Sequence, residues 1–179
     1  MTEAVSVQNV LRVPATPEVL RYERNFSSLC DVQGIELRTE VLKYVMEEAQ
    51  TSTDGAFDPS KLKETKRLLD LGMGRGAVGS IAKSMNPEME IVGIDFAEYQ
   101  GDTAYEAYNQ RIIGSLLEPQ VWETLKAQGA KFDAVLSVGL PIHVLEFLLS
   151  GNNIADVLDE KGQATIFTDM PVSVPEESL

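Results

Sequence analysis

The sequence has few of the residues from which disulfides and metal sites are built. Its 179 residues include one cysteine, Cys30, and one histidine, His143. A single cysteine cannot form a disulfide within the chain, which favours a reducing compartment, and we expect a cytoplasmic protein. With one histidine and one cysteine, only scattered carboxylates remain as metal ligands, so we expect no metal centre.

Basic residues and long apolar runs are also scarce. Fifteen Lys and Arg face 28 Asp and Glu, giving a formal net charge of −13. Binding to a phosphate backbone needs clustered cations, and only three lysines follow Arg111, so we expect no direct nucleic-acid partner. No apolar run approaches the roughly 20 residues that span a bilayer, and residues 1–6 carry no basic side chain, which argues against a secretory signal or a membrane partner.

What the chain does have is enough apolar sequence for one domain with its own core, since 44% of its residues are hydrophobic. Residues 1–15 lack periodicity and predict a flexible arm. Residues 16–60 predict a helical cap, because Thr16 and Pro17 are typical of a helix start and a second apolar periodicity follows. Residues 61–179 predict a cofactor-binding domain that forms one globular unit with the cap.

Strand and helix patterns alternate through this last segment. The pattern predicts an α/β fold with a doubly wound, mostly parallel sheet and helices on both faces. The predicted strands are 67–71, 90–95, 111–113, 132–138 and 163–168. The predicted helices are 75–86, 97–109, 118–128 and the apolar segment after residue 142.

Glycine occupies alternate positions directly after the first predicted strand, at Gly72, Gly74 and Gly76. Glycine tolerates positive φ and lets a ligand approach the backbone closely. A helix that begins after such a turn directs free N–H groups at whatever lies there. The stretch therefore predicts a loop that binds a nucleotide-like cofactor.

Two cofactor classes compete for this loop. Gly72, Gly74 and Ala77 satisfy the dinucleotide pattern G-x-G-x-x-G/A, which favours an NAD-binding oxidoreductase with pyrophosphate at the helix that begins near Arg75. Asp70 favours the other class. A carboxylate next to a pyrophosphate is repelled, whereas a cofactor with an ammonium and a sulfonium centre attracts it.

Residues 68–76, Leu-Leu-Asp-Leu-Gly-Met-Gly-Arg-Gly, resemble motif I of the class I S-adenosylmethionine-dependent methyltransferases, a Rossmann-like superfamily. The resemblance covers roughly residues 66–168 and implies about five strands in the order 3-2-1-4-5, without the last two strands of the family. An exposed fifth-strand edge would then need cover from a second copy, a partner chain or the N-terminal helices.

The resemblance also implies contacts with S-adenosyl-L-methionine. Asp70 is expected near the amino group of the cofactor, and Gly72, Gly74 and Gly76 are expected to let the loop approach the cofactor closely. Asp95 ends the second strand and is expected on the ribose, as the NAD alternative also requires. Residues 112–117 resemble the motif after the third strand, with serine where the family usually has an acid, and residues 132–144 resemble the fourth-strand motif. These two motifs and the position after Asp95 add four expected cofactor contacts: Phe96, Ser115, Leu116 and Ser137.

The resemblance implies transfer of a methyl group to an O or N atom of a small molecule, or of a protein side chain. His143 is the candidate general base because its side chain titrates near neutral pH. A non-catalytic binding or regulatory subunit of the same fold remains open, as does the NAD-binding oxidoreductase. Ser115 and the short C-terminal part favour the non-catalytic alternative.

Overall fold

The structure is a computed structural model. It describes residues 9–17, 60–101, 103–129, 131–140, 142–151 and 153–167. The predicted helical cap over 16–60 lies almost entirely outside these described residues, as do residues 1–8 of the predicted arm.

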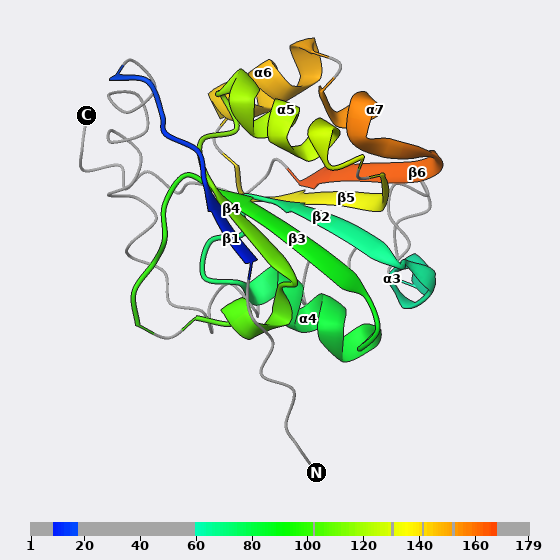
Figure 1. Ribbon diagram of the computed structural model, residues 1–179. Helices are drawn as coiled ribbons and strands as arrows, with labels where there is room; N and C mark the ends of the chain where they lie inside the picture. The colour runs from blue at the N-terminus through cyan, green and yellow to red at the C-terminus, as the bar shows by residue number, and fades with distance from the viewer. Residues whose placement is uncertain are drawn as a thin grey trace, which may run out of the picture.

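A parallel sheet of six strands forms the centre of the described part, in the order β1-β4-β3-β2-β5-β6 (Figure 1). The strands are β1 Asn9–Arg12, β2 Arg67–Leu71, β3 Glu90–Asp95, β4 Gln110–Ile113, β5 Phe132–Val138 and β6 Leu158–Phe167. All five predicted strands are present. Their expected order 3-2-1-4-5 is the order of β4, β3, β2, β5 and β6, but the expected number of strands is wrong.

The strand missing from the prediction is β1. It lies within residues 1–15, where we expected a flexible arm, and it pairs with β4 from Asn9–Gln110 to Arg12–Ile113. The ladder continues beyond the strand, because the Val13 N–H donates to the Ile113 carbonyl at 2.8 Å. β1 has four residues and is only partly buried, and its sequence shows no alternation of apolar and polar residues that would predict a strand. Its structure depends on a partner about a hundred residues away.

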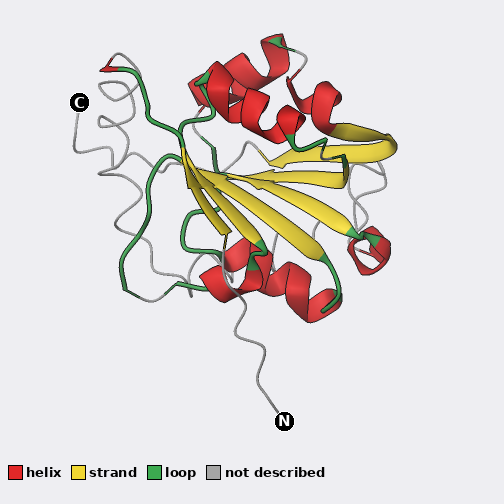
Figure 2. Ribbon diagram, in the orientation of Figure 1, coloured by secondary structure: helices red, strands yellow, loops and turns green. Residues whose placement is uncertain are grey.

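Helices cover both faces of the sheet (Figure 2). On one face lie α5 Pro119–Ala127, α6 Ile142–Ser150 and α7 Asn153–Val157, and on the other lie α3 Ser60–Glu64 and α4 Ala77–Met85. Successive side chains of a strand point to opposite faces. Leu69 and Leu71 of β2 therefore pack in the core under α5 to α7, while Leu68 packs in the core under α4.

The helix expected at 97–109 is wrong. The β3–β4 connection is a loop with one short 3-10 turn, η1 Tyr105–Ala107. Gly101 within it has a φ of 85°, which ends any right-handed helix. The backbone groups of the loop bond elsewhere, since the Ala104 N–H donates to the Arg75 carbonyl at 2.8 Å. The loop is therefore fastened onto the glycine turn after β2.

The last strand begins earlier than expected. β6 starts at Leu158, and its register with β5 shifts between the pairs Phe132–Leu158 and Ala134–Gln163. Residues 159–162, which include the predicted Lys161-Gly162 turn, thus form a bulge opposite Asp133. Gly162 allows close contact there, because a Cβ at this position would lie 2.7 Å from the Phe132 carbonyl oxygen.

Candidate functional site

The glycine turn joins β2 to α4 at the carboxyl edge of the sheet. Gly72, Gly74 and Gly76 have φ values of 77°, 53° and 93°, in the left-handed region that favours glycine. The N–H groups of Gly72 and Met73 both donate to the Ile94 carbonyl, at 2.8 and 3.0 Å. The turn is thus tied to the end of β3, where the predicted ribose ligand lies.

Asp95 is the last residue of β3 and is 6% exposed. Its Oδ2 accepts the Gly74 N–H at 2.8 Å and its Oδ1 accepts the Ala97 N–H at 3.1 Å. These bonds fix the carboxylate between the glycine turn and the β3–β4 loop. A carboxylate has about four lone-pair positions, so it can accept further hydrogen bonds from a pair of vicinal hydroxyls.

A cavity of about 230 Å³ opens beside Phe96, the residue after Asp95, between the carboxyl ends of β1, β3 and β4. Phe96, Ile113, Gly114 and Ser115 line it on one side, and residues 12–15 on the other. Drug-sized ligands occupy about 300–1,000 Å³, so this cavity suits a single ring system. Phe96 and Ser115 thus line one cavity, Asp95 directly precedes Phe96, and the contacts of all three with a cofactor stay predictions.

The loop after β4 is buried and hydrogen-bonded beside this cavity. Ser115 is 1% exposed, and its Oγ accepts the Leu117 N–H at 3.2 Å. Leu116 points into the core at 5% exposure, and its carbonyl accepts the indole N–H of Trp122 at 2.9 Å. Leu116 does not line the cavity with its neighbours.

Asp70 has a partner inside the fold. It is 0% exposed, and the Tyr108 hydroxyl donates to its Oδ2 at 2.6 Å. The same hydroxyl accepts the Gly79 N–H of α4 at 3.1 Å. Asp70 thus lies beneath α4 and apart from the cavity, and its contact with a cofactor amino group stays a prediction.

The other predicted residues lie on or after β5. Ser137 is 0% exposed, pairs with Leu71, and its Oγ has no hydrogen-bond partner among the described residues. A buried hydroxyl of this kind at the carboxyl edge of the sheet fits a ligand contact. His143 belongs to α6, but its side chain lies outside the described part of the structure, so its catalytic role stays a prediction.

Two of the turn glycines are needed for packing as well. A Cβ at Gly72 would lie 2.6 Å from Leu140 Cδ2, and one at Gly76 would lie 2.9 Å from the backbone of Ala104. Parts of the chain itself thus occupy space that the glycines leave open. The glycine pattern alone is therefore not proof of a ligand.

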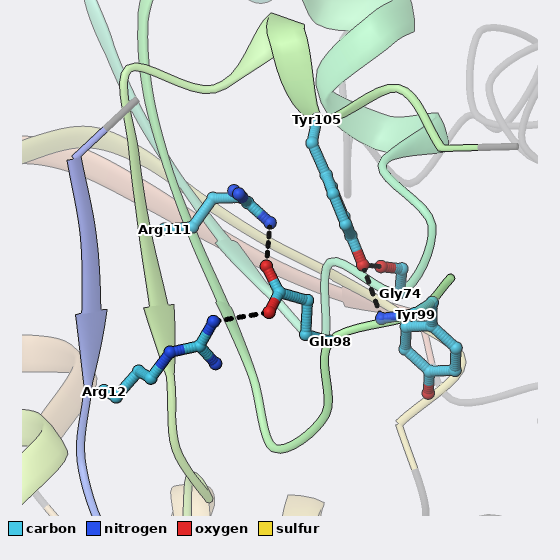
Figure 3. Close-up of polar contacts among 6 residues, drawn as sticks. All are labelled: Arg12, Gly74, Glu98, Tyr99, Tyr105 and Arg111. Atoms are coloured by element: carbon cyan, nitrogen blue, oxygen red, sulfur yellow. Dashed lines mark hydrogen bonds and ion pairs between the residues drawn. The ribbon is translucent and has the colours of Figure 1, made fainter. Parts of the chain in front are cut away.

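Sequence reasoning missed the residues that support the turn (Figure 3). Tyr105 donates its hydroxyl to the Gly74 carbonyl at 2.9 Å and accepts the Tyr99 N–H at 3.1 Å. Burial raises the pKa of Tyr105, which keeps the hydroxyl protonated as a donor. One signal was present, because Tyr99, Tyr105 and Tyr108 are three of the five tyrosines and all follow Asp95 closely.

The described residues offer neither a metal-binding cluster nor a membrane-spanning helix. They contain no group of three or more His, Cys, Asp or Glu side chains placed to hold a metal ion. Among them there is also no helix with the length and apolar character that crossing a membrane requires.

Comparisons with known proteins give matches only among solved structures. No protein-family profile and no curated protein matches the chain. The MycE methyltransferase of the mycinamycin biosynthetic pathway, crystallised with Mg and SAH, aligns over 86% of this chain with 16% identity and a TM-score of 0.50. The chain has the class I methyltransferase fold.

Two other structures align with this methyltransferase fold. A candidate O-methyltransferase of Nostoc punctiforme covers 74% of the chain at 21% identity with a TM-score of 0.46. A candidate caffeoyl-CoA O-methyltransferase of Staphylococcus aureus covers 86% at 16% identity, also with a TM-score of 0.46. The chain spans 44%, 40% and 66% of the MycE, Nostoc and Staphylococcus chains. The 16% identity to the MycE methyltransferase shows the fold alone.

Proposed function

We propose that this chain binds S-adenosyl-L-methionine and transfers its methyl group to an O or N atom of a small molecule in the cytoplasm. The observation that carries the proposal is the position of Asp95. Its carboxylate is fixed by the Gly74 N–H at the carboxyl end of β3, and the next residue, Phe96, lines a cavity of ring size together with Ser115. The MycE methyltransferase, which has the same fold, was crystallised with SAH, the demethylated product of this cofactor.

Each part of the cofactor has a matching group on the chain. Asp95 would accept the two ribose hydroxyls, and the cavity next to Phe96 would take the adenine ring. The glycine turn and the buried Ser137 hydroxyl would lie along the amino-acid part. When bound, the cofactor supplies a methyl group on a positively charged sulfur, open to in-line displacement by a nucleophilic O or N atom.

The chain would contribute mainly orientation and exclusion of water. Asp95 is buried and its carboxylate accepts hydrogen bonds from the Gly74 and Ala97 N–H groups, which suits a binding role more than proton transfer. Holding two reactants in line converts a bimolecular step into an effectively unimolecular one and removes about 7–11 kcal/mol from a barrier in favourable cases. His143 is proposed as the base for an acceptor that must lose a proton.

One observation favours a second candidate, a non-catalytic binding module of the same fold. Leu140 and Ala104 fill the close approaches at Gly72 and Gly76, so the glycines have a structural reason to be there. Such a module would bind the cofactor without turnover, or would bind a partner chain instead.

A thermal unfolding series tests the proposal. The full chain is heated alone and with a large excess of S-adenosylmethionine, S-adenosylhomocysteine, NAD or NADP. A ligand at about 100 times its dissociation constant adds about 2.7 kcal/mol. For a domain of this size, that is a rise in Tm of about 5–10 °C. We expect this rise with the two adenosyl amino acids and not with the dinucleotides.

Two variants make the test specific. Asp95→Asn removes the carboxylate and should abolish the rise, while Glu90→Gln at the opposite end of β3 should leave it intact. The apo Tm of each variant shows whether it folds. A rise with NAD alone would overturn the proposal in favour of an oxidoreductase. No rise with any of the four would overturn it in favour of a module that binds a partner chain.

A further inference from the structure

Glu98 connects two strands that the sequence separates by almost a hundred residues. Its Oε2 accepts a hydrogen bond from Arg12 Nη2 at 2.6 Å, and its Oε1 accepts one from Arg111 Nη1 at 3.0 Å (Figure 3). Arg12 ends β1, Arg111 belongs to β4, and Glu98 lies in the β3–β4 loop. Exposed ion pairs contribute little to stability, but the Arg111 side chain is only 8% exposed.

The group formed by Arg12, Glu98 and Arg111 is connected to the glycine turn through the ring of Tyr105. The Arg111 guanidinium lies 4.3 Å from the centroid of the Tyr105 ring, a distance typical of a cation–π contact. The Tyr105 hydroxyl donates to the Gly74 carbonyl, and the Gly74 N–H donates to Asp95. A continuous line of contacts thus runs from the end of β1 to the proposed ribose ligand.

Directly after Arg12, the chain forms one wall of the cavity. Residues 13–15 face Phe96 and Ser115 across it. A bond at each end holds this wall, from the Val13 N–H to the Ile113 carbonyl at 2.8 Å and from the Thr16 N–H to Glu118 Oε1 at 2.6 Å. Gly114 makes the close approach possible, because a Cβ there would lie 3.0 Å from Val13 Cβ.

We propose that Glu98 is a positioning residue for cofactor binding, which holds β1 against β4 so that residues 13–15 wall the cavity that takes the adenine ring. The inference rests on the proposed function. β1 has only four residues and pairs with β4 alone among the described strands, so the Glu98 contacts add side-chain support to a short ladder at the sheet edge. A cavity that has lost this wall leaves one side of the ring in water.

The test compares two glutamates of the full chain. Glu98→Gln removes the negative charge between the two arginines. Glu90→Gln is the matched control, because it breaks the Arg67–Glu90 pair of 3.1 Å at the amino end of β3. Titration calorimetry measures the affinity for S-adenosylhomocysteine, thermal unfolding gives the apo Tm, and hydrogen exchange reports the Val13 amide.

We expect Glu98→Gln to weaken binding and to speed exchange at Val13, with an apo Tm close to that of the parent. If the wall is in place about one tenth of the time, the affinity falls about tenfold. Glu90→Gln should leave affinity and exchange unchanged. Ala15→Trp, which fills the cavity from the same wall, should abolish binding without changing the apo Tm.

The outcomes separate this inference from the proposed function. If the parent chain binds S-adenosylhomocysteine and Glu98→Gln binds it equally well, the inference is overturned and the proposed function stands. If Glu98→Gln lowers the apo Tm as much as it lowers affinity, Glu98 supports the whole fold and the inference is overturned. If the parent chain does not bind, the proposed function fails and the inference falls with it.

Discussion

The substitution Tyr108→Phe removes one buried hydroxyl and leaves the aromatic ring in place. That hydroxyl donates to Asp70 Oδ2 at 2.6 Å and accepts the Gly79 N–H at 3.1 Å. Tyr108 is 1% exposed, so bulk water cannot replace either bond. Burial, and next the negative charge of Asp70, hold the pKa of Tyr108 well above its ordinary value of 10.0 and keep the hydroxyl a donor.

The expected loss of stability follows from these two bonds. A hydrogen bond to a charged group contributes about 1.5–3 kcal/mol, and a buried N–H left without a partner costs about 1–3 kcal/mol. Because both effects involve one hydroxyl, they overlap, and we expect a net loss of about 2–4 kcal/mol. A domain of this size would lose about 4–16 °C in Tm.

Urea unfolding measures this loss conveniently, because Trp122 is the single tryptophan and is 1% exposed, which makes its fluorescence a probe of the core. Asp70→Asn is the companion variant. It keeps an acceptor oxygen for the Tyr108 hydroxyl and should lose less stability. A loss below about 0.5 kcal/mol for Tyr108→Phe, as at ordinary surface sites, would refute the reasoning. If Asp70→Asn abolished cofactor binding at unchanged stability, the predicted contact with the cofactor amino group would replace the structural role.

Two more predictions follow from the same loops. A non-glycine residue in the left-handed conformation costs about 1–2 kcal/mol of stability. Gly129→Ala should lose only that amount, because nothing lies within 4 Å of the added Cβ, whereas Gly76→Ala should lose more, because its Cβ would lie 2.9 Å from the Ala104 backbone. Urea unfolding of both variants tests this difference. The hydrogen bond from Arg12 leads the effects that hold the pKa of Glu98 below its ordinary 4.5. A lowered carboxyl pKa adds stability above the unfolded-state value, and this is lost as the pH falls through the folded-state value. The small stability advantage of the parent over Glu98→Gln should therefore shrink as the pH falls below the ordinary carboxyl value of 4.5, and a difference that grew on acidification would contradict this.

The central strands could be predicted because their sequences carry the signal locally. β2, β3 and β5 are buried on both faces, so they appear as short apolar runs between turns. β1 and the β3–β4 loop carry no such signal. Their structures depend on contacts with Ile113 and Arg75, which are remote in the sequence, and no local pattern encodes those contacts.

The candidate site divides in the same way. Asp95, Phe96 and Ser115 follow directly after strands, so predicting the strands also placed these residues at one edge of the sheet. The hydrogen bond between Tyr108 and Asp70 joins residues 38 positions apart, so spacing in the sequence could not reveal it. The pairing of Glu98 with Arg12 spans 86 positions and was equally invisible.

The packing of the Tyr108 ring against Gly79 and Gly93 also has an evolutionary consequence. A Cβ at Gly79 or at Gly93 would lie 2.5 or 2.6 Å from that ring, so both glycines are required as long as the tyrosine is present. Positions 79 and 108 should therefore change together among homologous sequences, and a larger residue at position 93 needs smaller residues at both 108 and 73, because a Cβ at Gly93 would also lie 2.6 Å from Met73 Sδ. This linked pattern gives a way to recognise distant relatives of the chain.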